Sequence, residues 1–146
     1  MSPDEETLDE YRFVEVRDEL GDLANIYVNL IKRFRKDLKH LSRDKENDVS
    51  KLGQTLERIR VLRARLRFLL EFITNSLTRE EIRSDIREDL EIITSFFELS
   101  ALRDERSMLE KLIKLRPELK ESLEKDLRDI EYIQNIATKI YVVKKD

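Results

Sequence analysis

The residues best suited to chemistry lie in LERIRVLRARLRFLL, residues 56–70, where five arginines share an apolar stretch with a single acid. Guanidinium groups bind carboxylates and phosphates through paired hydrogen bonds. The formal net charge of the chain is −3, so this row is a local feature of a mildly acidic protein. The row could pair with acids of the same chain, contact a partner protein, or bind nucleic acid.

Projection of this stretch on a helix, at 100° per residue, separates its arginines into two groups. Arg60, Arg63 and Arg67 fall opposite the expected core stripe, whereas Arg58 and Arg65 flank it. The stripe consists of Leu52, Leu56, Ile59, Leu62, Leu66, Leu69 and Ile73. We expect the trio Arg60, Arg63 and Arg67 to face outward and to bind a partner, and the flanking pair to meet acids on a neighbouring helix.

The expected source of those acids is the segment 80–91, which holds six acids and two arginines. Packing of this segment beside residues 48–75 would neutralise part of the arginine row. Within the row itself, Glu57 stands three residues before Arg60 and Glu71 four after Arg67, which is helical pairing distance.

A second basic run, KRFRKDLKH (residues 32–40), supports a weaker interpretation. Lys32, Lys36 and Lys39 lie away from the apolar side of their helix and are typical of a solvated face. The run has no exposed aromatic residues for base stacking, and the chain has no helix-turn-helix spacing or RNA-binding consensus. We therefore expect at most weak, salt-sensitive phosphate contact from these lysines.

Catalytic and metal-binding residue types are scarce. The chain has no cysteine, which excludes disulfides, zinc–thiolate sites and thiol nucleophiles, and His40 is its single histidine. A di-iron carboxylate bundle would need two histidines. The carboxylates are spread along exposed faces and no glycine-rich phosphate loop occurs. We expect a protein that is not an enzyme and that carries no cofactor or metal.

Composition and periodicity predict a single all-α domain over residues 1–146. Hydrophobic residues make up 40% and charged residues 42%, and only two glycines and two prolines occur. The first ten residues are acidic and read as a frayed start or as the first turns of a helix begun by Ser2-Pro3. The first stripe has unbroken spacings of three and four: Leu20, Leu23, Tyr27, Leu30, Phe34, Leu38 and Leu41.

Further helices follow from local signals. The second is expected from about Asp48 to Asn75, and a capping box of Thr78 with Glu81 predicts the start of the third. The periodicity loosens after Leu99, which predicts a turn. Pro117 suits the first turn of the last helix.

The tail, residues 138–146, changes character at Tyr141, Val142 and Val143, which could form a short strand or an apolar hook onto a partner. The predicted fold is thus an antiparallel bundle of four to five helices with a short β tail. No stretch approaches about 18 consecutive apolar residues and no leader is evident. We expect a cytoplasmic protein without membrane contact.

Three blocks in order resemble the helical A-domain of GINS subunits, particularly archaeal ones. They are LGDLANIYVNLIKRFRKDL (20–38), LERIRVLRARLRFLLEFI (56–73) and LTREEIRSDIREDLEII (77–93), preceded by a Tyr-Arg-x-x-x-x-Arg run from Tyr11 to Arg17. In that family an aromatic-centred helix is followed by an arginine-rich helix and then by an L-T-x-E-E helix start. Two departures are Ile82-Arg83, where the family has a leucine-tyrosine pair, and the lack of room for a β-rich B-domain.

The resemblance implies a non-catalytic scaffold of DNA replication. GINS subunits assemble into a tetramer through their helical domains and bridge the MCM helicase to a RecJ-like partner, so the implied location is nucleoid-associated. Two other functions remain open from the residues. One is a small helical, weakly nucleic-acid-binding subunit of a ribonucleoprotein effector complex. The other is a self-associating helical adaptor.

Overall fold

The computed structural model describes the backbone of residues 3–41, 46–77 and 82–145, and the side chains of residues 11–41, 49–76 and 82–140. The helices are α1 (Pro3–Leu41), α2 (Glu46–Leu77), α3 (Ser84–Phe96), a π-helical turn η1 (Phe97–Ala101), α4 (Leu102–Leu115), a 3₁₀ turn η2 (Pro117–Leu119) and α5 (Lys120–Lys145). The described residues contain no strand. The prediction of an all-α chain is therefore confirmed.

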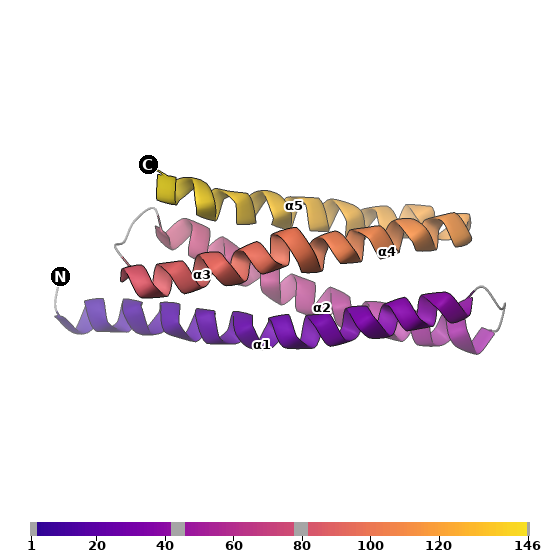
Figure 1. Ribbon diagram of the computed structural model, residues 1–146, viewed down its shortest axis with the longest axis horizontal. Helices are drawn as coiled ribbons and strands as arrows, with labels where there is room; N and C mark the ends of the chain where they lie inside the picture. The colour runs from indigo at the N-terminus through magenta and orange to yellow at the C-terminus, as the bar shows by residue number, and fades with distance from the viewer. Residues whose placement is uncertain (1–2, 42–45, 78–81, 146) are drawn as a thin grey trace.

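The helices run lengthwise beside one another (Figure 1). α3, η1 and α4 follow each other as one long rod, which packs against α1 and α5. α2 packs chiefly against α1 and α5. The bundle thus consists of four rods: α1, α2, the α3–η1–α4 rod and α5. Each rod has neighbours on two sides and an outer face toward solvent.

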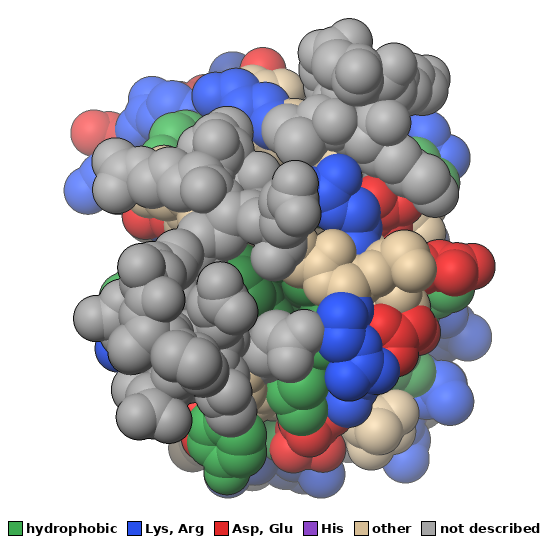
Figure 2. Space-filling model, turned by 90° about the vertical axis from the view of Figure 1, so that its left-hand side faces the viewer, with side chains coloured by type: hydrophobic (Ala, Val, Ile, Leu, Met, Phe, Trp, Pro, Cys, Tyr) green, Lys and Arg blue, Asp and Glu red, His purple; other side chains and the backbone are tan. Residues whose placement is uncertain are grey.

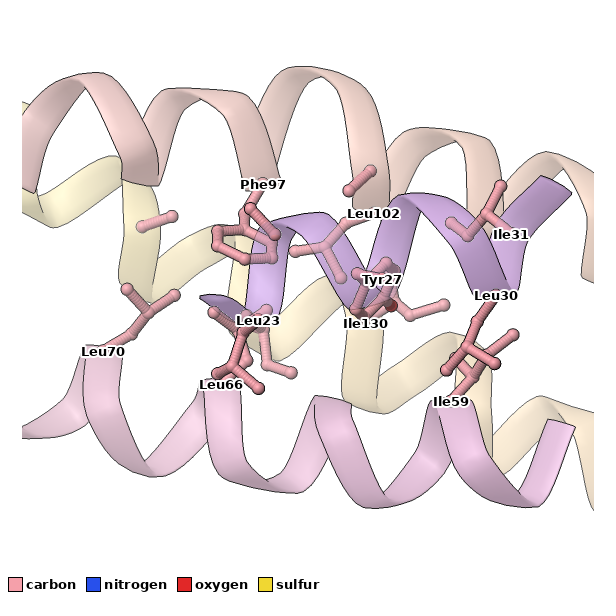
Figure 3. Packing of buried hydrophobic residues seen from close by; sticks show 14 of the residues in the cluster. Leu23, Tyr27, Leu30, Ile31, Ile59, Leu66, Leu70, Phe97, Leu102 and Ile130 are labelled. Carbon is pink, nitrogen blue, oxygen red and sulfur yellow. The ribbon is translucent and has the colours of Figure 1, made fainter. Parts of the chain in front are cut away.

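Apolar side chains from all of the rods fill the interior. Every member of the first predicted stripe, from Leu20 to Leu41, is buried. Figure 3 shows Tyr27 from α1, Leu66 from α2, Leu102 from α4 and Ile130 from α5 pointing into this common core. The periodicity argument thus located the buried face of α1, because spacings of three and four keep side chains on one side of a helix.

The predicted turn after Leu99 is wrong. The chain instead continues through η1 into α4 without leaving the helical path. Buried residues follow Phe97 at both four and five positions, Ala101 and Leu102, whereas a regular α-helical turn holds 3.6 residues. A π-helical turn absorbs the extra residue and keeps both α3 and α4 facing the core. The loosened periodicity marked this insertion.

The other predicted boundaries are partly confirmed. α2 begins and ends within two residues of the predicted bounds, and Pro117 opens the turn that leads into α5. The capping box of Thr78 and Glu81 lies outside the described residues, and Ile82, predicted inside the third helix, precedes its first residue, Ser84. α1 is already helical from Pro3.

The proposed β tail is not formed, because α5 continues as helix to Lys145. Helix formation here overrides the weak strand preference of Tyr141, Val142 and Val143, as the cooperative extension of an existing helix allows. The side chains of these three residues lie outside the described part. Among the described residues, no helix is both long enough and apolar enough to cross a membrane.

Candidate functional site

A layer of polar side chains crosses the apolar core. Arg63 of α2 is the largest fully buried side chain, with 1% of its surface exposed, and Glu105 of α4 is equally buried. Asp126 of α5 and the Tyr27 hydroxyl of α1 complete the layer. Each of the four rods therefore contributes one polar side chain at this level.

These groups pair with one another, although Arg63 Nε and Glu105 Oε2 have no hydrogen-bond partner among the described residues. Tyr27 donates its hydroxyl hydrogen to Glu105, and Arg63 donates to the Asp126 carboxylate and, at 3.3 Å, to the Asp126 carbonyl oxygen. Arg63 also lies 3.4 Å from Glu105 Oε2 and 3.6 Å from Asp129. Arg60 closes the layer from its edge with two hydrogen bonds of 2.9 and 2.8 Å to Asp126. Burying charges is tolerable only when they are paired in this way.

Burial also changes the acid–base behaviour of the layer. Loss of water around Glu105 raises its pKa to about 7, although Arg63 and the Tyr27 hydroxyl oppose the change. The pKa of Tyr27 is raised well above its ordinary value, first by burial and then by the neighbouring Glu105 charge. Glu105 thus changes its charge near neutral pH inside the core.

The prediction that Arg60, Arg63 and Arg67 face outward is wrong for Arg63, whereas Arg67 is exposed, as predicted, and Arg60 lies between the two. Arg63 is buried, Arg60 is half-buried against Asp126, and Arg67 binds Asp129 at 3.2 Å while its guanidinium stacks over the Tyr132 ring. α5 therefore covers this face of α2. The two helical pairs expected along α2, Glu57 with Arg60 and Glu71 with Arg67, are both present.

The prediction that Arg58 and Arg65 meet acids on a neighbouring helix is confirmed for Arg65 only. Arg65 binds Glu19 of α1, as expected of a residue that meets a neighbouring helix, whereas Arg58 has no acid partner among the described residues. Asp85 and Asp89 do not pair with α2, contrary to expectation: Asp89 binds Arg17 of α1, and Asp85 binds Arg83. α5 and α1 supply the acids instead.

A stricter pattern in the sequence could have located Arg63. The buried positions of α2 follow spacings of four and three without a break when the arginine is included: Leu52, Leu56, Ile59, Arg63, Leu66, Leu70 and Ile73. Glu105 and Asp126 occupy equivalent positions in α4 and α5, between Leu102 and Leu109 and between Leu123 and Ile130. Reading only apolar residues places Leu62 in the stripe and turns Arg63 outward.

The concentration of basic residues that remains accessible is a groove between the end of α1 and the beginning of α2. The groove has a volume of about 670 Å³. Its lining consists of Lys32, Arg33, Lys36, Asp37, His40, Lys51, Gln54, Thr55 and Arg58. Asp37 accepts a hydrogen bond of 3.3 Å from Thr55 and is the single acid of the lining.

This groove differs from the rest of α1 and α2 in its charge pairing. No ion pair within 4.0 Å joins Lys32, Arg33, Lys36, Lys51 or Arg58 to a described carboxylate, whereas most other arginines of α1 and α2 are paired. Figure 2 views the opposite end of the molecule, where the described basic and acidic side chains are interspersed. The groove therefore carries a net positive charge available to a ligand.

The predicted lysines divide between two clefts. Lys32 and Lys36 line the groove, whereas Lys39 lines a separate cleft of about 420 Å³ between α1 and α4 with Arg35, Asp104 and Met108. Among the described residues, no cluster of three or more acidic or histidine side chains could hold a metal ion. The groove offers cations and amide donors, which are groups that bind anions.

Comparison of the chain with protein families, with characterised proteins and with solved structures finds no match.

Proposed function

We propose that this protein is a non-catalytic assembly subunit, an antiparallel bundle of four helical rods whose basic groove binds an acidic surface of a partner protein. The observation that carries the proposal is the set of five cations in the groove that have no ion pair to a described carboxylate, in a chain with net charge −3. Elsewhere α1 and α2 pair most of their described arginines within the chain. Unpaired charges at a fixed position favour complementary partners and speed their association.

The lining favours an acidic protein over nucleic acid. No aromatic side chain lines the groove, so bases have no stacking surface there. From Lys32 to His40 the α1 wall is about 12 Å long at 1.5 Å per residue. Carboxylates one helical turn apart on a partner helix would meet cations on both walls over this length. Arg33 and Arg58 add forked donors suited to carboxylates.

The partners follow from the resemblance to GINS subunits. The first two blocks that carry it fall within α1 and α2, the helices that form the groove. Under this proposal the protein joins other GINS-type subunits in a hetero-oligomer, and its groove contacts an acidic surface of the MCM helicase or a RecJ-like protein. The buried polar layer fixes the mutual register of the rods that present the groove, a role documented for polar residues at core positions.

The test is binding of purified candidate partners to the wild-type chain and to the variant Lys51→Glu/Arg58→Glu. Both residues lie on the α2 wall and neither has a described ion-pair partner, so their replacement leaves the intrachain pairs intact. We expect the variant to keep its helical circular dichroism and to bind the partner at least about tenfold more weakly, which is about 1.4 kcal/mol.

A matched control reverses two exposed charges of α5, Lys120→Glu/Lys139→Glu, and should bind like the wild type. Short DNA and RNA duplexes and single strands form the other arm of the experiment. Tight binding of these nucleic acids with a steep salt dependence, together with no binding of the protein candidates, would overturn the scaffold proposal in favour of a nucleic-acid subunit.

A further inference from the structure

The outer face of α1 carries an ordered sequence of charges. Its exposed residues at spacings of three and four are Glu15, Asp18, Asp22, Asn25, Asn29, Lys32, Lys36 and Lys39. They lie opposite the buried stripe that includes Leu20, Tyr27 and Phe34, because a shift of two residues turns a helix by about 200°. Three acids, two asparagines and three lysines thus follow one another along a single outward line.

This line is complementary to itself when reversed. In an antiparallel pair of identical helices, positions whose numbers have a constant sum lie opposite each other. With the two-fold axis at residue 27, Glu15 faces Lys39, Asp18 faces Lys36, Asp22 faces Lys32, and Asn25 faces Asn29. Every charged position of the line meets the opposite charge, and the two amides meet at the centre.

The helix dipole does not account for this order. Acids near the start and bases near the end of a helix are favourable, but the effect falls off within the first and last turns. α1 extends from Pro3 to Leu41, so Asp18, Asp22 and Lys32 lie several turns from either end. Intrachain pairing does not account for it either, because Asp22, Lys32 and Lys36 have no described ion-pair partner and Asp18 contacts only its neighbour Arg17.

We propose that the outer face of α1 binds a second copy of this chain in an antiparallel, two-fold symmetric pair. The occupant is another copy because the complementarity holds along the whole line in one register. Ile26, which is 48% exposed, stands beside the axis on one edge of the line and would lie near Ile26 of the other copy, adding an apolar contact at the centre. A two-fold interface repeats each contact, so three kinds of ion pair become six.

The predicted dimer is weak and sensitive to salt, because exposed ion pairs each contribute little and are screened. Sedimentation equilibrium of the wild-type chain from about 1 µM to about 1 mM should show a monomer–dimer equilibrium at low ionic strength. Raising the salt from about 0.01 M to about 1 M shortens the Debye length from about 30 Å to about 3 Å and should return the chain to monomer. A chain that stays monomeric at low salt overturns the proposal.

Two charge-reversed variants test the register. Lys32→Glu/Lys36→Glu makes the line largely acidic, and Asp18→Lys/Asp22→Lys makes it largely basic. Each variant alone places like charges opposite each other. Its homodimer should therefore have a dissociation constant at least about tenfold higher than that of the wild type, so that the variant is monomeric under the same conditions. In an equimolar mixture every reversed position again meets an opposite charge, so a heterodimer should form. Variants that are monomeric alone and also when mixed overturn the antiparallel register.

The same variants separate this inference from the proposed function. Lys51→Glu/Arg58→Glu changes the groove and leaves the α1 line intact, so it should still dimerise. Asp18→Lys/Asp22→Lys leaves every groove residue intact and should lose the homodimer while keeping the acidic partner. Loss of dimerisation on changing Lys51 and Arg58 would place the self-contact in the groove and overturn the inference.

Discussion

Arg63 and Asp126 form an ion pair in which both side chains are almost fully buried, 1% and 6% exposed. The pair joins α2 to α5 inside a core that is otherwise apolar at these positions. Because the Tyr27 hydroxyl and Glu105 extend the same layer to α1 and α4, a shift of one rod along another would break buried contacts of this layer. The layer therefore determines how the rods are aligned, and with them the walls of the basic groove.

Replacement of Arg63 tests the structural role of this layer. Arg63→Met leaves Asp126 and Glu105 buried with fewer partners, and it should lower the free energy of unfolding by about 3–5 kcal/mol. Arg65→Met is the matched control in the same helix, because Arg65 is half-exposed and pairs with Glu19 at the surface; it should cost less than about 1 kcal/mol. Urea denaturation of both variants measures the difference, and equal losses would contradict a special role for Arg63.

Glu105 should make stability depend on pH. Its pKa rises from 4.5 to about 7 in the folded chain, so between these values the folded state holds a proton that the unfolded state has lost. This contribution is fully present below the unfolded pKa and is lost as the pH rises through about 7. The free energy of unfolding should fall with rising pH by up to about 1.4 kcal/mol per unit.

Glu105→Gln isolates this effect, since glutamine cannot titrate and still accepts the Tyr27 hydrogen bond. Relative to the wild type, the variant should gain stability as denaturation is repeated from about pH 5 to about pH 8. Glu110→Gln makes the same change on the exposed face of α4 and should leave the profile unaltered. Parallel profiles for the wild type and Glu105→Gln would show that Glu105 does not titrate in this range.

Because η1 holds one residue more than a regular helical turn, we expect the protein to tolerate the deletion of one residue there. Removing Ser100, an exposed residue of η1, turns the spacing from Phe97 to Leu102 from five into four and restores a regular helix. This deletion should change the free energy of unfolding by no more than about 1 kcal/mol. Removing the exposed Lys111 instead rotates Leu112 by about 100° away from the core and should cost several times more. Thermal unfolding followed by circular dichroism compares them, and similar losses would argue against the π turn.

The apolar face of α1 and the extent of α2 could be predicted because three-four periodicity responds directly to burial. The position of Arg63 could not be read from hydrophobicity, since its burial depends on acids more than forty residues away in α4 and α5. The same dependence on distant partners explains why Arg67 turned out to face α5. Only one wall of the groove could be predicted from the sequence, because Lys32 and Lys36 lie on one helix and Lys51 and Arg58 lie on another.

The central claim, that the basic groove binds an acidic partner protein, is tested most directly by affinity purification of tagged wild-type chain from its native cells beside the Lys51→Glu/Arg58→Glu variant. The co-purifying protein is then bound to both chains in purified form. The account predicts a protein with an acidic contact surface whose dissociation constant rises at least about tenfold with the variant and stays unchanged with Lys120→Glu/Lys139→Glu. Equal binding of the partner by all three chains would contradict it.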